Sequence, residues 1–353
     1  MPIDVDLLRE LTQTPGIASR EDLVRNVVAK HLRPLVDDLA VDALGNLIGR
    51  RKGSGGPRIA IAAHMDEIGF LVRHIDDSGF LRIQRVGGFD PRVLVAQRVM
   101  VHPRVGDALP GVLQPGTKPI HLQQAGDKSD LKLEDLFIDV GLPVETVNDH
   151  IRIGDMVTLE RDLIEVGNTV VSKALDDRLG VYVMVEAIRK TTASTAEIVA
   201  IATTQEEIGL RGAVASAYSI EPDVTIALDV TIAGDIPGAT PDAHVTSLGK
   251  GTAIKILDSS QIANPKIVDH LRELATELGI PNQDEILPFG GTDAGAFQTS
   301  RGGRATCTIS IPTRYVHTVN EMAHTGDIQA SVDLLAAFLD AAGTRSYSYE
   351  VPA

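Results

Sequence analysis

The order of apolar and polar residues divides the chain into two kinds of segment. Before Ile68 and again after Val170, apolar residues recur at helical spacing or in short continuous runs, which indicates helices alternating with buried strands. From about Ile68 to Glu165 the apolar runs are shorter, alternate with polar residues and are broken by turns. That pattern is typical of an all-β structure. The sequence therefore predicts an α/β chain that an all-β segment interrupts.

The α/β part predicts a mostly parallel sheet covered on both sides by helices, because strands and helices alternate along it. Pro15 and Gly16 should end the first helix, and Ser19 is a good N-cap for the second. Helices are expected at 3–16, 19–36, 211–220, 264–281 and 327–343, and a loop that leads into a helix at 173–191. Strands are expected at 58–64, 196–204, 223–230 and 306–313.

The all-β segment should form its own small core in a barrel-like domain. Residues 70–86 predict a hairpin that turns at Asp77–Gly79. We expect residues 68–165 to form an inserted domain, and residues 1–67 and 166–353 to form the α/β domain.

Composition narrows the classes of function. The net charge of −15 argues against nucleic acid and anionic membranes as partners, because both require a basic face. Cys307 is the only cysteine, so a metal would have to be held by His and carboxylates. The start of the chain resembles no signal peptide, and no stretch approaches the roughly 20 apolar residues of a membrane span. A soluble, cytoplasmic protein is expected.

Metal-binding residue types recur after the predicted strands of the α/β part. Ligands in open α/β sheets bind outside the carboxyl ends of the strands, so these side chains could meet in one site. The candidates are His64, Asp66, Asp176, Glu206, Glu207, Asp229 and His317. Each also has an ordinary structural explanation: a lone His is more often a satisfied polar residue, an Asp is often an N-cap, and a Glu pair is usually solvated. Such residues occur in five separate stretches of the α/β part. A chance occurrence in all five is a less attractive explanation than a shared site.

The chemistry of this set would be coherent. Two His and several carboxylates without Cys suit Zn²⁺, Co²⁺ or Mn²⁺, and two cations about 3.5–4 Å apart need a bridging carboxylate. Asp66 could accept the second N–H of the His64 imidazole and fix its tautomer. Adjacent glutamates on extended chain point in different directions, so one of Glu206 and Glu207 could bind metal while the other faces water.

Five motifs, in this order, resemble the tetrahedral (TET) di-metal aminopeptidases, a family of glutamyl, leucyl and deblocking enzymes that sometimes carry the label endoglucanase. The motifs are AAHMDEIGF, KALDDRLG, TTQEEIGLRGA, ALDV and RYVHT. The stretches DLFIDVG and IRIGDMV resemble the β insert of that family, so the resemblance covers nearly the whole chain.

The resemblance implies a role for each candidate. His64 and Asp229 would hold one ion, Glu207 and His317 the other, and Asp176 would bridge them, with a cis peptide bond to Asp177. Asp66 would orient His64, and Glu206 would be the general base. It further implies a dimerisation role for the insert, a hollow dodecamer built from dimers, and peptides as substrates.

Three other functions compete with this interpretation. A related di-metal carboxypeptidase or deacylase shares the motifs but usually carries an α/β lid domain instead of a β insert. A glycosidase would need aromatic sugar platforms, and the chain has 3% aromatic residues and no Trp. A structural cage without metals is the non-enzyme alternative. The preferred N-terminal residue stays open, with a neutral or broad preference favoured and a glutamyl one possible.

Two loops and two single residues have weaker signals. Residues 288–297 are either a simple helix start or part of a pocket wall, and residues 231–238 are a candidate pocket loop. His324 is expected to be structural, and Cys307 to lie in the core.

Overall fold

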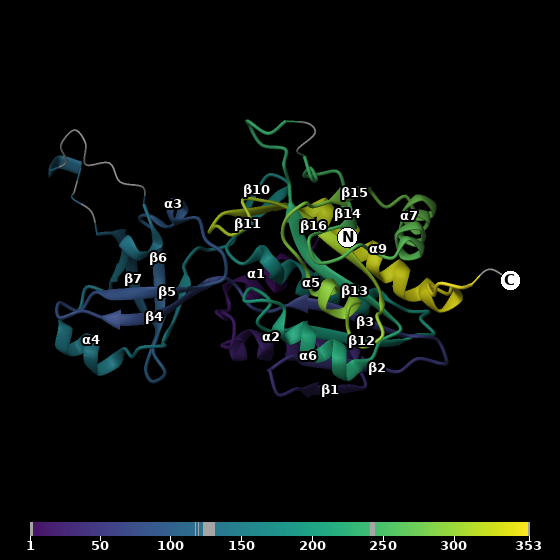
Figure 1. Cartoon of the computed structure of the whole chain (residues 1–353), viewed down its shortest axis with the longest axis horizontal. Helices are drawn as coiled ribbons and strands as arrows, with labels where there is room; N and C mark the ends of the chain where they lie inside the picture. The colour runs from purple at the N-terminus through teal and green to yellow at the C-terminus, as the bar shows by residue number, and fades with distance from the viewer. Residues whose placement is uncertain (1–2, 117, 119, 123–130, 241–243, 352–353) are drawn as a thin grey trace.

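A computed structural model describes residues 3–116, 118, 120–122, 131–240 and 244–351 of the chain. These residues form a large mixed sheet flanked by helices and, to one side of it, a smaller closed β-barrel (Figure 1). The predicted α/β fold with an inserted barrel is confirmed.

The main sheet has parallel strands at its centre and antiparallel strands on both sides. Its strands, in spatial order, are β1 (Asp38–Val41), β2 (Leu47–Arg51), β12 (Glu197–Thr203), β3 (Arg58–His64), β13 (Val224–Ile232), β16 (Ala305–Arg314), β17 (Glu321–His324), β11 (Thr169–Ser172) and β10 (Ile164–Val166), with β14 (Thr252–Leu257) and β15 (Asn282–Ile286) attached beside β16. From β12 to β16 all neighbours pair in parallel, as predicted. The outer strands add antiparallel pairs, so the sheet is mixed.

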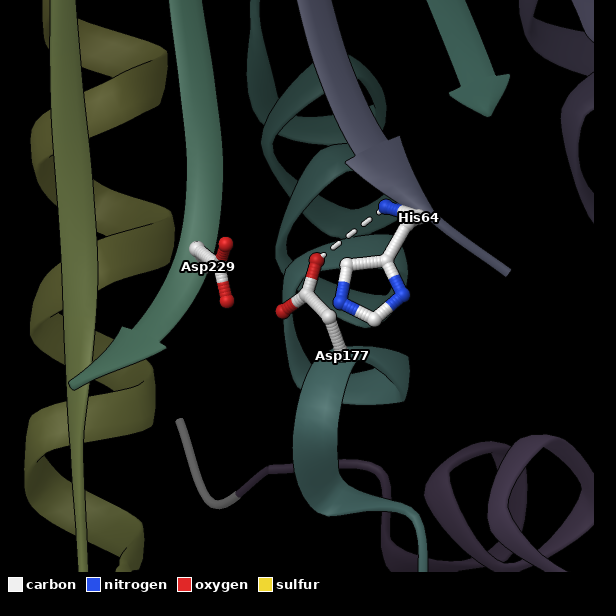
Figure 2. A group of neighbouring side chains, drawn as sticks. All are labelled: His64, Asp177 and Asp229. Carbon is white, nitrogen blue, oxygen red and sulfur yellow. Dashed lines mark hydrogen bonds between the residues drawn. The ribbon is translucent and has the colours of Figure 1, made fainter. Parts of the chain in front are cut away.

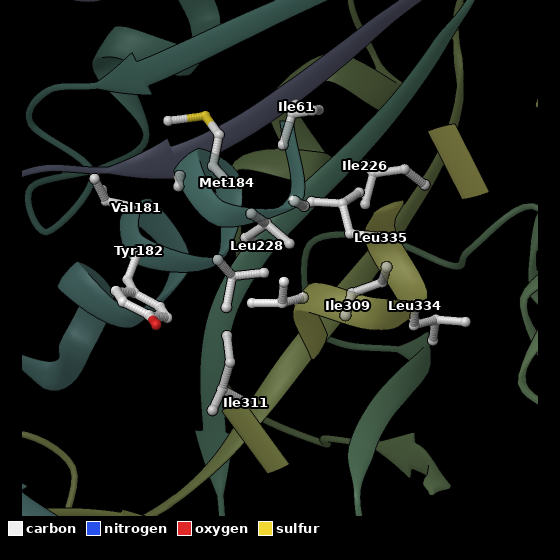
Figure 3. Packing of buried hydrophobic residues seen from close by; sticks show 14 of the residues in the cluster. Ile61, Val181, Tyr182, Met184, Ile226, Leu228, Ile309, Ile311, Leu334 and Leu335 are labelled. Atoms are coloured by element: carbon white, nitrogen blue, oxygen red, sulfur yellow. The ribbon is translucent and has the colours of Figure 1, made fainter. Parts of the chain in front are cut away.

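Helices cover both faces of this sheet. One face packs against α1 (Val5–Gln13), α2 (Asp22–Leu32), α5 (Leu175–Lys190), α7 (Pro265–Leu278) and α9 (Thr325–Ala341), and the other against α6 (Arg211–Ile220) and α8 (Asp293–Gln298). The period of two along β3 explains the division: Ile59 and Ile61 enter the first core, while Ala60 and Ala62 enter the second. Figure 3 shows Ile61 in the first core beside residues of β13, β16 and α9.

The predicted start of the second helix is wrong. Ser19 has φ 70°, a left-handed conformation that differs from the extended backbone of an N-cap, and α2 begins at Asp22 with Glu21 before it. Glu21 instead turns inward, where its Oε1 accepts the N–H of Ser19 at 2.9 Å. The first helix ends before Pro15, as expected.

The barrel closes through six strands and has a core of its own. In spatial order they are β4 (Gly69–Ile75), β5 (Leu81–Val86), β8 (Leu136–Asp139), β7 (Leu109–Pro115), β6 (Arg98–His102) and β9 (Met156–Leu159). The predicted hairpin is β4–β5, and its turn is stabilised because Asp76 Oδ1 accepts the N–H groups of Ser78 and Phe80. Phe70 and Val72 of β4 both point into the barrel core.

Short helices complete the described fold: α3 (Pro91–Leu94), α4 (Val144–His150), η1 (Arg33–Leu35), η2 (Ile120–Leu122), η3 (Leu133–Asp135) and η5 (Ala342–Thr344). Among the described residues, no helix has both the length and the apolar character needed to cross a membrane.

Candidate metal centre and active site

The predicted site residues converge beyond the central parallel strands. Thr203, the last residue of β12, lies opposite His64, the last residue of β3, so the segments that follow both strands leave the sheet together. Most of the predicted residues line one cavity of about 350 Å³, and Asp66 is buried behind it. The predicted residues on the cavity wall are His64, Asp176, Glu206, Glu207, Asp229 and His317.

The start of α5 supplies two neighbouring carboxylates to the site. Asp176 and Asp177 have non-helical backbone angles, and the peptide bond between them is cis, as the resemblance implied. The fully buried Arg178 follows them, and its Nε donates a hydrogen bond of 2.7 Å to the carbonyl of Met65. Arg178 thereby fixes this turn against the segment that carries His64.

The imidazole of His64 lies between two partners. Its Nδ1 is 2.9 Å from the backbone carbonyl of Asp66, and its Nε2 is 3.0 Å from Asp176 Oδ1. A carbonyl only accepts, so Nδ1 carries a proton, and Nε2 is the ring nitrogen that is directed at Asp176. The carboxylate of Asp66 is farther from Nδ1, at 3.7 Å. The backbone of Asp66 therefore sets the tautomer of His64 more directly than its side chain does.

The side chain of Asp66 instead holds the pair of glutamates. Its Oδ1 accepts the N–H of Glu206 at 3.0 Å and its Oδ2 accepts the N–H of Glu207 at 3.2 Å. Both bonds are made by a fully buried carboxylate, so the backbone of the two glutamates is fixed relative to His64. The sequence prediction paired Asp66 with His64 alone and did not identify this contact.

His317 lies on the other side of Asp176. Its Nε2 is 3.3 Å from Asp176 Oδ2 and 3.2 Å from Glu207 Oε1. Each oxygen of Asp176 thus faces a different imidazole. Glu321, which the sequence analysis missed, accepts the backbone N–H of His317 at 2.8 Å and that of Asp176 at 3.0 Å.

Asp177 is the second residue that the sequence analysis missed. Figure 2 shows it with His64 and Asp229, and ligand atoms of these three residues lie within 4.8 Å of one another. A second group with the same spacing consists of His64, Asp176 and Glu207. Both oxygens of Asp177 already accept backbone N–H groups, from His64 at 3.3 Å and from Gly180 at 2.9 Å. These bonds indicate that Asp177 supports the backbone around the site. Asp176 is therefore the more available ligand for a metal ion.

The cluster is strongly acidic and buried. Burial and the neighbouring carboxylates raise the pKa of Glu206 and of Asp229 well above the usual range. Burial works against a charged His317, but its hydrogen bonding to the carboxylates of Asp176 and Glu207 outweighs burial and raises the pKa of the imidazole to about 11. Both effects show the same deficit of positive charge, which a cation would relieve.

The donor set fits divalent metal ions. The atom pairs His64–Asp176, His317–Asp176 and His317–Glu207 are 3.0–3.3 Å apart. Two ligands that share one ion at about 2.0–2.2 Å are separated by roughly that distance. Glu206 belongs to neither of the two ligand groups, although its Oε2 lies 4.0 Å from His64 Nε2 and its side chain lines the cavity.

Comparison with models of known protein families matches residues 45–334 to the M42 glutamyl aminopeptidase family. The chain belongs to this family. Two curated relatives are a putative aminopeptidase of Acetivibrio thermocellus, 40% identical over 94% of this chain and 96% of the relative, and a lysyl aminopeptidase of Pyrococcus furiosus, 35% identical over 96% and 97%.

Solved structures of aminopeptidases have the same fold as this M42 chain. An aminopeptidase of Desulfurococcus kamchatkensis is 42% identical, with a TM-score of 0.91 and coverage of 95% of this chain and 94% of that one. The TET1 peptidase of Pyrococcus horikoshii, described as assembling into a tetrahedron or a large octahedral shell, is 33% identical, with a TM-score of 0.83 and coverage of 95% and 98%. The chain is therefore an M42 peptidase, a hydrolase that acts at peptide N-termini.

The rest of the cavity wall of this M42 peptidase comes from the two loops noted in the sequence. Residues 289–292 line it and also lead directly into α8 at Asp293, so both interpretations of that stretch apply. Thr231 and Ile232 line it from the end of β13. His324 caps α9 by accepting the N–H of Gly326, and Cys307 is fully buried in the core, as predicted.

Proposed function

We propose that this M42 peptidase removes the N-terminal residue of peptides with two divalent ions held around Asp176. His64 and Asp229 would hold one ion, Glu207 and His317 the other, and Asp176 would bridge them. The observation that carries this proposal is the position of Asp176, whose two oxygens face the Nε2 atoms of different imidazoles at 3.0 and 3.3 Å. A carboxylate in that position is what a two-ion centre requires.

Glu206 is the general base in this proposal. Such ions, when bound, supply Lewis acidity toward water and toward the scissile carbonyl. Glu206 accepts the proton of the attacking water at its carboxylate and then passes it to the nitrogen of the leaving amine. Its raised pKa suits a group that must both accept and release a proton. Asp66 positions Glu206 by holding its backbone N–H.

The donor set suits Zn²⁺ best, with Co²⁺ or Mn²⁺ as the other ions compatible with imidazole and carboxylate ligands. We expect a neutral or broad preference for the N-terminal residue, with a glutamyl preference as the alternative. Relatives differ in this respect, since the family is described as glutamyl and the Pyrococcus furiosus protein as lysyl. The test below also distinguishes this activity from that of a carboxypeptidase or a deacylase and from a metal-free cage.

We further propose that residues 68–165 form a dimerisation domain and that dimers assemble into a tetrahedral dodecamer. The closed barrel with its own core supports an independent domain. The tetrahedron described for the Pyrococcus horikoshii peptidase supports the assembly, and a cytoplasmic location stays a prediction.

The test is hydrolysis of paired substrates by metal-loaded protein. Aminoacyl-p-nitroanilides with a free α-amine should be cleaved, and the same compounds with an N-acetyl group should not. Cleavage of acetylated substrates would favour a deacylase, and cleavage of residues from peptide carboxyl ends would favour a carboxypeptidase. A protein that binds no metal and cleaves none of these substrates would favour the structural cage.

A further inference from the structure

The cavity has a wall that no step of the proposed reaction uses. Away from the metal-type residues it is lined by Ile232, Leu287, Phe289 and Val316. Ile232 is 43% exposed and Phe289 is 82% exposed, so a ligand in the cavity can contact both. A side chain held next to the reacting peptide bond would meet mainly apolar surface on this wall.

Among the described residues, Lys255 is the one lysine or arginine that lines the cavity. It lies on β14 and is fully buried. Its Nζ is 2.8 Å from Glu285 Oε1 and 3.6 Å from Asp258 Oδ2. Burial alone would lower the pKa of Lys255, but Glu285, with smaller contributions from Asp229 and Asp258, keeps that pKa above its usual value.

The two carboxylates lie behind Lys255, because neither Glu285 nor Asp258 lines the cavity. Glu285 Oε1 also accepts the hydroxyl of Thr231 at 2.6 Å, which fixes it in this position. The charge of Lys255 is therefore balanced by two carboxylates within the protein, although its Nζ makes no hydrogen bond with the described residues. A substrate carboxylate would be buried without a free cation, and a substrate ammonium would find no carboxylate on the apolar wall.

We propose that the Lys255–Glu285–Asp258 ion cluster and the apolar wall make this subsite select a neutral, apolar N-terminal residue. The inference rests on the proposed aminopeptidase function and names the substrate class of that same site. Glu285 acts here as a specificity-determining residue, since its ion pair with Lys255 makes the charge of Lys255 unavailable to a substrate carboxylate. Acidic residues are disfavoured for this reason, and basic residues because the wall carries no acid of its own.

The first test compares aminoacyl-p-nitroanilides of Leu, Met, Phe, Glu, Asp, Lys and Arg on wild-type, metal-loaded protein. The value of kcat/KM for Leu should exceed those for Glu and Lys by at least about tenfold, because an uncompensated charge must be desolvated in the subsite. A preference for Glu or for Lys would overturn the inference and leave the aminopeptidase function intact. If none of the substrates is cleaved, the result would instead contradict the proposed aminopeptidase function.

The second test changes the charge balance. Glu285→Gln keeps the shape and the hydroxyl contact but leaves Lys255 less compensated, so the Glu-to-Leu ratio of kcat/KM should rise about tenfold or more. Asp284→Asn is the matched control, because Asp284 is the preceding residue on β15, is exposed and pairs with Arg272 at the surface. This control should leave the ratio unchanged.

Ile232→Lys is a second variant that tests the same inference if Glu285→Gln does not fold. Ile232 is partly exposed on the cavity wall, so a lysine there adds an uncompensated cation without disturbing the buried cluster. It should raise the same ratio. Calorimetry with free L-leucine and L-glutamate should show the same change in binding. An unchanged ratio and unchanged binding in a folded variant would overturn the inference.

Discussion

At the scale of residues, three buried carboxylates support the site without lining its cavity. Asp66 accepts the backbone N–H groups of Glu206 and Glu207, and Glu321 accepts those of Asp176 and His317. Glu21 accepts the N–H of Gln205, the residue directly before the glutamate pair. Each carboxylate therefore fixes the backbone from which proposed functional side chains project, as outer-shell groups do at metal sites.

Glu21 makes the stability of the protein depend on pH. Burial, with a smaller contribution from Asp66, raises its pKa from an ordinary 4.5 to about 7. Its contribution to stability is complete below its unfolded pKa and is lost as the pH rises through about 7. Glu21→Gln keeps an acceptor oxygen and never ionises. Between pH 5 and 8 its free energy of unfolding should fall less than that of wild type, by an amount on the order of 1–3 kcal/mol.

Denaturant unfolding at several pH values measures this difference. Asp284→Asn, which removes an exposed carboxylate, should follow the wild-type pH dependence. Parallel curves for Glu21→Gln and wild type would show that Glu21 is ionised normally in the folded protein.

At the scale of elements, the loop after β5 joins the barrel to the site. Gly88 in this loop lies so close to His317 that an added Cβ would be 3.2 Å from its Nδ1 and 3.4 Å from its Cε1. Gly87 is similarly close to Glu207, because its Cβ would be 3.0 Å from Oε2. The inserted segment thus leaves no room for a side chain beside the proposed ligands of the second ion.

Gly88→Ala should displace the His317 imidazole. A shift of a few tenths of an ångström at a ligand should lower turnover by about 10–100-fold, while the free energy of unfolding changes by less than about 1 kcal/mol. Gly302→Ala is the matched control, because a Cβ there meets no atom within 4 Å. Turnover assays with metal analysis measure the effect. Normal activity in Gly88→Ala would show that the loop yields without moving His317.

The sequence predicted the elements with strong periodicity better than those that depend on tertiary partners. β3 and α9 were predicted because long apolar patterns mark them. β15 was missed because its residues, NQDEI, are mainly polar, and it is a strand only because β14 pairs with it. Ser19 was misassigned because its local chemistry suits an N-cap, whereas the observed backbone turns before the helix begins.

The same contrast holds at the site. The motif residues could be singled out because they are metal-binding residue types that follow the predicted strands directly in the sequence. Asp177 had no signal that separated its role from that of Asp176, since both occur in the same DD pair. Glu321 and Lys255 are ordinary charged residues in the sequence, and only the fold brings them to the cavity or behind it.

At the scale of the whole molecule, the acid cluster should make stability depend on metal. Without metal, burial and mutual repulsion raise the pKa values of Glu206, Asp229 and Asp177, so the stability from these groups is lost as the pH rises. Metal ligands must be deprotonated, so affinity for metal rises over the same range. Stabilisation by metal should therefore be larger at pH 8 than at pH 5.5.

Thermal unfolding with and without Zn²⁺ after chelator treatment checks this expectation. The increase in Tm should grow with Zn²⁺ concentration and with pH, as expected for a ligand that binds only the folded state. A Tm that is independent of Zn²⁺ at both pH values would argue against a metal centre in the cluster.

The most direct test of the account is metal content and turnover measured together on Glu206→Gln. Glu206 lies in neither ligand group, so the variant should retain the wild-type content of about two ions per chain. Its kcat should fall by about 10²–10⁴-fold, because the proton acceptor is lost. Wild-type turnover with full metal content would contradict the role of Glu206 as the base. Loss of the ions themselves would show that Glu206 is a ligand and that the proposed division of the two glutamates is wrong.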